Sequence, residues 1–201
     1  FVIAIVIAIP AGLIAATRKN SGMDHAVSMV AFLGLSMPDF WLAILLIIVF
    51  AANLHWLPAI GYAPLSEGFW PWFSHLILPA IAVGTAFSAI VARMIRSSML
   101  EVLNSNFIRT ARAKGLPKSR IIFKHALKPA MLPVISYLGP AFVGMITGSV
   151  VIDVYFSTGG IGQLFVNSAL NRDYSVMMGI TILLGALIIF FNMIVDILYA
   201  W

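Results

Sequence analysis

The sequence contains no cysteine and few charged residues, and these two absences narrow the possible classes of protein. Without a thiol, the chain can form neither a disulfide nor a thiolate metal site. Charged residues make up only 9% of the chain, against 62% apolar residues. A water-soluble domain of 201 residues could not expose so much apolar surface without aggregating. The composition therefore indicates an integral membrane protein.

The motifs of common enzymatic sites are also missing. There is no G-x-x-x-x-G-K-[ST] phosphate loop to cradle ATP and no G-x-S-x-G nucleophile elbow. Gly160, Ile161 and Gly162 lack the third glycine of a dinucleotide fingerprint. The four histidines have neither i, i+4 pairing nor H-E-x-x-H spacing: His25, His55, His75 and His125. We therefore predict no catalytic residue, no metal ligand and no cofactor on this chain.

Long apolar stretches predict membrane-spanning helices. Five of them approach or exceed the roughly 20 helical residues that cross about 30 Å of hydrocarbon. They cover residues 1–17, 26–52, 76–92, 129–152 and 174–195. The sequence opens inside an apolar run, without Met and without the basic leader and cleavage site of a signal peptide. We predict an all-α membrane protein with five spans in a single transmembrane domain, residues 1–201, whose first span is truncated.

Positive charge is concentrated in one polar segment between the third and fourth spans. Seven of the twelve Lys and Arg residues lie between Arg109 and Lys128, with no acidic residue among them. Of all twelve, only Arg172 falls on the opposite side of the predicted bundle. The positive-inside rule places the basic side in the cytoplasm. From charge alone, this segment is suited either to docking on a partner or to binding anionic lipid.

Turn and capping residues divide residues 104–130 into short helices. Asn104 or Ser105 can cap a helix that Gly115 ends, and Pro117 suits the first turn of a second helix. In the first helix, one face is predicted to carry Phe107 and Ala111 at i, i+4, and another Arg109 and Arg112.

Several segments resemble one family of transport proteins. RTARAKGL (109–116), followed by HALKPAMLPV (125–134), is similar to the cytoplasmic signature loop of the permease subunits of ABC importers. Arg109, Thr110 and Ala111 stand at the Glu-Ala-Ala positions of that loop, and Gly115 at its glycine. The RTARAKGL form of the signature loop is typical of one branch of this family, the peptide and nickel importers. Similarity to its oligopeptide-importer B-type permeases extends over residues 27–199, as in SMLEVLNSNFIRTARAKGLP, GPAFVGMITGSVVIDVYF, GGIGQLFVNSALNRDYS and FNMIVDILYA.

The resemblance implies a type I ABC importer permease fold, with six spans in the full subunit and the first upstream of Phe1. It also implies a bacterial cytoplasmic membrane and an assembly with a second homologous permease, two ABC ATPase subunits that bind ATP and Mg, and an extracytoplasmic peptide-binding protein. Membrane lipid is an expected partner and nucleic acid is not. Residues 104–130 would be the coupling loop, whose ATPase-docking residues are Asn106, Phe107, Arg109, Thr110, Ala111, Arg112, Ala113, Lys114, Gly115 and Leu116.

Polar and small residues within the spans are candidates for the translocation path. Because the fifth helix of the family lines that path, the resemblance implies Met145, Thr147 and Ser149, to which we add Asn192 in the last span. Gly144 and Gly148 form a small-xxx-small face, for which close helix packing is the main expectation.

Two intramembrane acids leave a competing hypothesis open, because burying a carboxylate in lipid is costly. Asp39 follows Pro38 near the middle of the second span, and Asp196 shares a face with Asn192. A proton-coupled secondary transporter would use such acids. We favour a carboxyl paired within the bundle for Asp39 and a position near the cytoplasmic interface for Asp196.

The predicted function is that of a permease subunit of an ATP-driven oligopeptide importer, without an ATPase site of its own. Dipeptides, glutathione and nickel chelates are alternative cargoes within the same family. A path for bare metal ions is disfavoured, because the spans lack convergent carboxylates, imidazoles and thiols.

Overall fold

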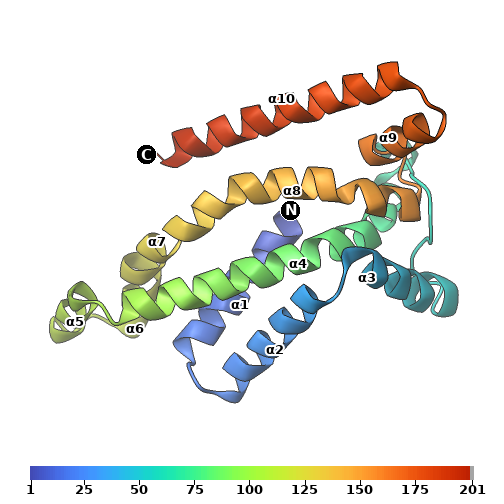
Figure 1. The fold of residues 1–201 in the computed structure, drawn as a ribbon. Coiled ribbons are helices and arrows are strands. Elements are labelled where there is room, and N and C mark those ends of the chain that lie inside the picture. Colours follow the sequence, from blue (N-terminus) through green and yellow to red (C-terminus); the bar gives the residue numbers. More distant parts are fainter. Residues whose placement is uncertain (200–201) are drawn as a thin grey trace.

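The computed structural model describes residues 1–199, except for the side chains of residues 143, 147–149, 195 and 198–199. All regular structure in this part of the chain is helical (Figure 1). The long helices are α1 (Val2–Thr17), α2 (Gly22–Ser36), α4 (Phe69–Leu103), α8 (Leu132–Phe156) and α10 (Tyr174–Tyr199). Shorter elements connect them: α3 (Asp39–Leu46), η1 (Ile47–Asn53), η2 (Leu65–Glu67), α5 (Asn106–Ala113), α6 (Lys118–Arg120), η3 (Ile121–Ala126), α7 (Leu127–Ala130) and α9 (Ile161–Leu170).

The predicted spans all fall on helices, but not all are single straight helices. Among the described residues, α4 and α10 are each long and apolar enough to cross a membrane, and two bent pairs raise the number to four if each pair is one span. The 16-residue α1 is apolar but shorter. The second predicted span is broken, because α2 meets α3 and η1 at an angle of 103°.

Pro38 explains this break. Proline has no N–H to continue the helical hydrogen bonds, and it disfavours the helical conformation in the residue before it. Met37 accordingly has extended backbone angles, with φ −91° and ψ 125°, and α3 begins immediately after Pro38. Asp39 therefore opens a new helix instead of lying in the middle of one.

A close helix crossing joins α1 to α4. Small buried residues recur at every fourth position along α1: Ala4, Ala8, Gly12 and Ala16. A Cβ on Gly12 would lie 2.5 Å from the carbonyl oxygen of Ala92 and 2.8 Å from Cβ of Ile95, so only glycine fits there. A Cβ on Gly144 would meet no atom within 4 Å. The described residues therefore place no atom in close contact with that position, and the side-chain surroundings of residue 148 lie outside the described part.

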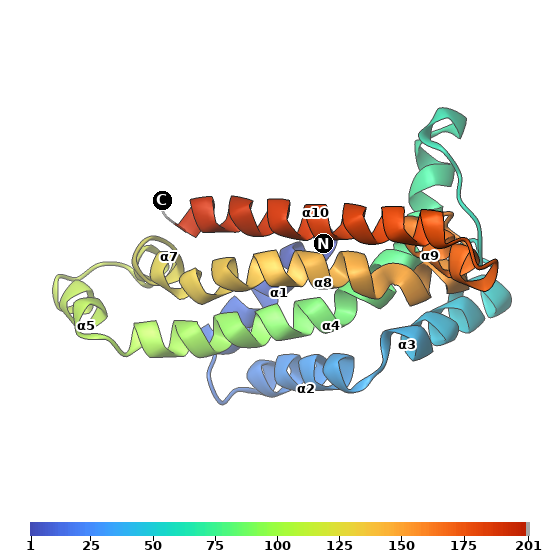
Figure 2. The ribbon, with the colours of Figure 1, turned by 45° about the horizontal axis from the view of Figure 1, so that its top comes forward.

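The connecting elements gather at two opposite ends of the bundle. Figure 1 and Figure 2 show α5, α6 and α7 at one end and α3 and α9 at the other, with α4 running the whole length. The 35 residues of α4 make a helix of about 52 Å, which exceeds the roughly 30 Å of a bilayer core. This helix therefore carries the basic loop well beyond the hydrocarbon.

Candidate functional site

The helix α5 is fixed to the end of the bundle by two apolar residues. Ile108 is 0% exposed and Ala111 is 8% exposed, and both belong to one core cluster with Met99 of α4 and Ile121 of η3. We predicted that Phe107 and Ala111 share the apolar face. Ala111 is buried as predicted, but the prediction is wrong for Phe107, which is 50% exposed. Residues three apart share a helix face as well as residues four apart do, so the spacing of Ile108 and Ala111 was the signal to find this pair.

Gly115 ends α5 as predicted, in a left-handed conformation with φ +73°. Its N–H donates to the carbonyl oxygen of Arg112 at 2.9 Å, and the N–H of Leu116 donates to that of Ala111 at 3.3 Å. These two bonds form a Schellman motif, which satisfies carbonyls that the helix end would otherwise leave open. Leu116 packs against the same core cluster as Ile108. The turn after α5 is thus rigidly defined.

At its start, α5 differs from the prediction. Ser105 occupies the capping position, but its side chain does not cap α5. Its hydroxyl donates instead to the carbonyl oxygen of Val102 at 2.6 Å. Asn104 lies at the end of α4, and Arg112 Nη2 donates to the carbonyl oxygen of Leu103 at 3.4 Å. Both side chains, of Ser105 and Arg112, therefore complete the last turn of α4.

The exposed residues of this loop form a basic surface that also carries an aromatic ring. We call it the α5 surface, and it consists of Asn106, Phe107, Arg109, Thr110, Arg112, Ala113, Lys114 and Gly115, all exposed. Two predicted docking residues do not belong to it, because Ala111 is buried and Leu116 is half-buried. Arg109 and Lys114 form no ion pair with any described residue. The α5 surface therefore presents uncompensated positive charge.

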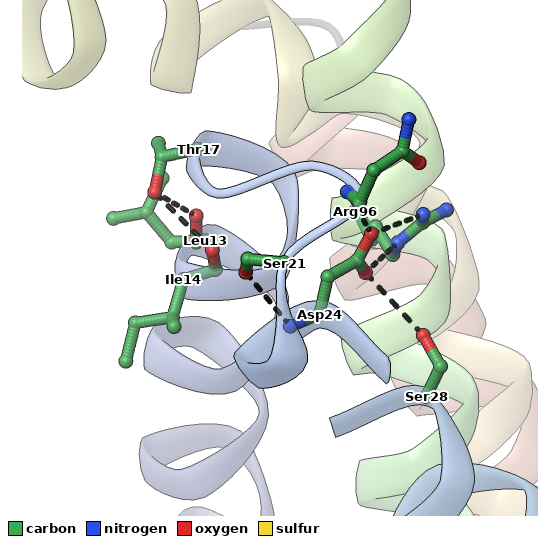
Figure 3. Close-up of polar contacts among 8 residues, drawn as sticks. Leu13, Ile14, Thr17, Ser21, Asp24, Ser28 and Arg96 are labelled. Carbon is green, nitrogen blue, oxygen red and sulfur yellow. Dashed lines mark hydrogen bonds and ion pairs between the residues drawn. The ribbon is translucent and has the colours of Figure 1, made fainter. Parts of the chain in front are cut away.

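A buried ion pair joins α2 to α4 (Figure 3). It lies in the half of the bundle that also carries α5. Asp24, 1% exposed, accepts hydrogen bonds from Arg96 Nε at 2.6 Å and from Nη2 at 2.8 Å. The N–H of Asn20 donates to the same carboxylate at 3.0 Å. This pair was not predicted, because its two members lie 72 positions apart and no local sequence pattern connects them.

At the opposite end, Asp153 fixes the turn from α8 into α9. Its carboxylate accepts hydrogen bonds from the hydroxyl of Thr158 at 2.8 Å and from the N–H of Gly162 at 3.1 Å. A Cβ on Gly160 would collide with this carboxylate, and one on Gly162 would collide with the backbone of Val150. Gly160 and Gly162 are therefore needed because α8 and the start of α9 pack closely against each other. This structural role accounts for the two glycines without a dinucleotide site.

The structure separates the predicted path residues. Met145 lines a cavity of about 240 Å³ between α3, α4 and α8, together with Asp39 and Tyr137. Asn192 is exposed on α10 and does not line this cavity. The side chains of the other two predicted path residues, Thr147 and Ser149, lie outside the described residues.

Of the two acids, Asp39 contradicts our expectation of a partner within the bundle. It makes no ion pair or hydrogen bond with any side chain that the structure describes. Asp196 is exposed in the last turns of α10. The C-terminal end of α10 lies at the same end of the bundle as α5 (Figure 1). That position agrees with the predicted cytoplasmic interface.

The fold and the basic loop define the class of protein. Residues 8–201 match the model of the family of binding-protein-dependent transport system inner membrane components, and the chain belongs to this family. It is a multi-pass component of the bacterial inner membrane. It also has the fold of a chain of the MetNI methionine ABC transporter, with a TM-score of 0.77 and 19% identity over 98% of this chain and 86% of that one. The predicted type I importer permease fold is therefore confirmed.

Individual relatives are oligopeptide permeases. The chain is 56% identical to the oligopeptide transport system permease protein OppB of Salmonella typhimurium and 54% identical to that of Escherichia coli K12, in both cases over 200 residues. It is 44% identical over 204 residues to the permease protein AppB of Bacillus subtilis. These alignments cover 99–100% of this chain but only 63–64% of the relatives, so the chain spans less than two thirds of their length.

Proposed function

We propose that this chain is a permease subunit of an ATP-driven importer of oligopeptides. It forms half of a translocation path together with a second homologous permease subunit. The observation that carries the proposal is the α5 surface: a basic patch held rigidly beyond the membrane by the long helix α4. The identity to oligopeptide permeases along the whole chain supports the same function.

The α5 surface is the docking site for an ATPase subunit in this proposal. Exposed Phe107 provides an apolar anchor, and Arg109 and Lys114 provide charges that can pair with acidic groups of the partner. Ile108 connects α5 to α4 and η3 within one packed cluster. Movement of the docked helix is therefore transmitted to α4 and α8 through packed side chains, because packed clusters shift as units.

The remaining partners follow from what the chain lacks and where its loops lie. ATP and Mg are bound by two ABC ATPase subunits, because this sequence has no phosphate loop. Cargo arrives on an extracytoplasmic binding protein at the end that carries α9. Residues 1–201 act as one transmembrane domain, with residues 104–130 as its coupling loop.

The translocation path runs beside α8 in this proposal, with Met145, Thr147 and Ser149 on its wall and Asn192 contributed by α10. Methionine adapts to varied shapes, and a few polar groups among apolar walls suit cargoes that differ in their side chains. Dipeptides, glutathione and nickel chelates are the alternative cargoes to be tested.

Reconstitution of the full-length protein with its partner subunits tests this function. Vesicles containing the complex should take up a labelled short peptide only when the binding protein is outside and ATP is on the side of the ATPase subunits. Competition with dipeptides, glutathione and a nickel chelate then ranks the cargoes. Uptake that needs no ATP and follows an imposed proton gradient would show instead a proton-coupled transporter.

A further inference from the structure

We infer that the cavity at Asp39 is a subsite for a primary ammonium group of the cargo, in the first place the N-terminal ammonium of a peptide. This inference rests on the proposed function, because it names the part of the cargo that the path recognises. It adds a specific residue and a specific chemical group to that path.

The cavity lies halfway along the apolar part of α4. Val83 and Phe87 form its wall on α4, within the apolar stretch of residues 76–92. Tyr137 and Met145 form its wall on α8, and Asp39 belongs to the first turn of α3. A ligand here would therefore be close to the middle of the membrane, away from both polar ends of the bundle.

Asp39 differs from the other two acids whose contacts were described above. Asp24 is neutralised by the guanidinium of Arg96, and Asp153 accepts hydrogen bonds from Thr158 and Gly162. Asp39 is half-buried and has no such partner among the described residues. The start of α3 offers it a partial positive charge, but this interaction is weaker than that with a full charge. A carboxyl group at this depth is neutralised either by a proton or by a cation, and a cargo ammonium group would supply the cation.

The break between α2 and α3 brings Asp39 to the cavity. Met37 is extended, the following Pro38 is exposed, and Asp39 is the first residue beyond them. Of these three residues, Asp39 lines the cavity. The chain thus interrupts a span directly before the carboxylate that borders the cavity.

The other walls suit an ammonium group on a variable chain. The rings of Phe87 and Tyr137 stack with centroids 6.0 Å apart and an interplanar angle of 12°. Phe87 is 4% exposed and packs between Phe1 and Tyr137, so the half-buried ring of Tyr137 is the one that can offer a face to a cation, and Met145 adapts to different neighbours. The volume of about 240 Å³ is below the roughly 300–1,000 Å³ of pockets that enclose a whole ligand. The cavity therefore accommodates one end of a peptide, and an N-terminal ammonium is common to peptides of any sequence.

The first test compares Asp39→Asn with Asp39→Glu in the complete complex reconstituted in vesicles. With the binding protein saturating, Asp39→Asn should raise the apparent KM for a free-amine peptide by about tenfold, because a charged hydrogen bond is lost. Asp39→Glu should retain most of the function. Asp196→Asn is the matched control, because it removes an exposed carboxylate far along α10 and should leave uptake unchanged.

Two modified peptides distinguish the sources of the ammonium group. If the N-terminus is the ligand, an N-acetylated peptide without lysine should be insensitive to Asp39→Asn. If a lysine side chain serves equally well, an N-acetylated peptide with one lysine should show the same dependence on Asp39 as the free-amine peptide. Equal KM values for the wild type and Asp39→Asn with all three peptides would overturn the inference. The inference would also be overturned if Asp39→Asn reduced only the uptake that is driven by a proton gradient.

Zero-length crosslinking tests the contact without any variant. A carbodiimide joins a carboxylate to an amine only when the two are in contact. In wild-type complex loaded with a free-amine peptide, the modified residue should be Asp39. Peptide attached to other carboxylates and not to Asp39 would overturn the inference even if Asp39→Asn fails to fold. If the wild-type complex imports no peptide at all, the proposed function itself fails, which is a distinct outcome.

Discussion

The ion pair of Asp24 and Arg96 shows what two side chains contribute to the half of the bundle that carries α5. Its geometry is bidentate, with both carboxylate oxygens bonded to the guanidinium, and Asp24 is almost completely buried. Charge-assisted pairs of this kind are stronger than neutral hydrogen bonds and fix orientation. Removal of one partner leaves the other charge in a poorly solvated place, so the two residues depend on each other.

Asp24→Asn should therefore destabilise the folded protein. Breaking a buried pair by removing one partner costs about 3–5 kcal/mol, and the 30% exposure of Arg96 reduces this to about 2 kcal/mol. The measurement is the thermal unfolding midpoint in detergent, with the exposed Glu67→Gln as control. A double variant, Asp24→Leu with Arg96→Met, should lose less than the two single variants together. Additive losses, or an unchanged midpoint for Asp24→Asn, would contradict the pair's role.

Among the helices, the short α5 and the turn that ends it determine how the α5 surface is presented. Gly115 has φ +73°, and a Cβ there would meet no atom within 4 Å. Space is therefore available for a side chain, and only the backbone conformation selects glycine. A substitution at Gly115 therefore acts through the backbone conformation of the turn, without causing a steric clash.

Gly115→Val should uncouple ATP hydrolysis from transport, because a β-branched residue is strained at positive φ by about 1–3 kcal/mol. Gly115→Asn is the matched control, because asparagine tolerates the left-handed conformation and should keep near-wild-type coupling. The quantity to measure is peptide imported per ATP hydrolysed by the reconstituted complex. Wild-type coupling in Gly115→Val would mean that this turn does not determine how α5 docks.

The elements were predictable where one local pattern decides the structure. Apolar length located the spanning helices, and Gly115 located the end of α5. Two features were mispredicted because they depend on tertiary context. Ile108 is buried instead of Phe107, and the hydroxyl of Ser105 bonds back to α4. A cap or a buried face is chosen by what packs against it, and a single sequence does not contain that neighbour.

For the whole molecule, the loops lie at two opposite ends of the bundle. We predict that one end faces the outside of the cell and the other, with the basic loop, faces the inside. The chain has no native cysteine, and Ser66 and Ser119 are both exposed, in η2 and α6. Ser66→Cys should react with an impermeant thiol reagent added outside the cell. Ser119→Cys should react only after the inner face is opened. The reverse pattern would contradict the positive-inside orientation.

The pairing of distant segments was the part of the whole molecule that sequence patterns left undetermined. The crossing of α1 and α4 at Gly12, the bond between Asp24 and Arg96, and the cavity at Asp39 each join residues from separate helices. Resemblance to a family predicted the fold that contains them. It did not predict which side chains meet, because each contact depends on helix positions accurate to about an ångström.

We propose that the α5 surface contacts the subunit that hydrolyses ATP, and site-specific photocrosslinking can detect this contact in the assembled complex. A photoreactive amino acid replaces Phe107, which is 50% exposed, in the full complex in its membrane. Ser66 serves as the control position, because it lies in η2 just before the start of α4, whereas α5 follows the end of α4. Crosslinking at position 107 should yield an adduct with the ATPase subunit, and position 66 should yield none. Adducts with lipid alone at position 107, in a complex that still contains the ATPase, would contradict the claim and favour a lipid-binding loop.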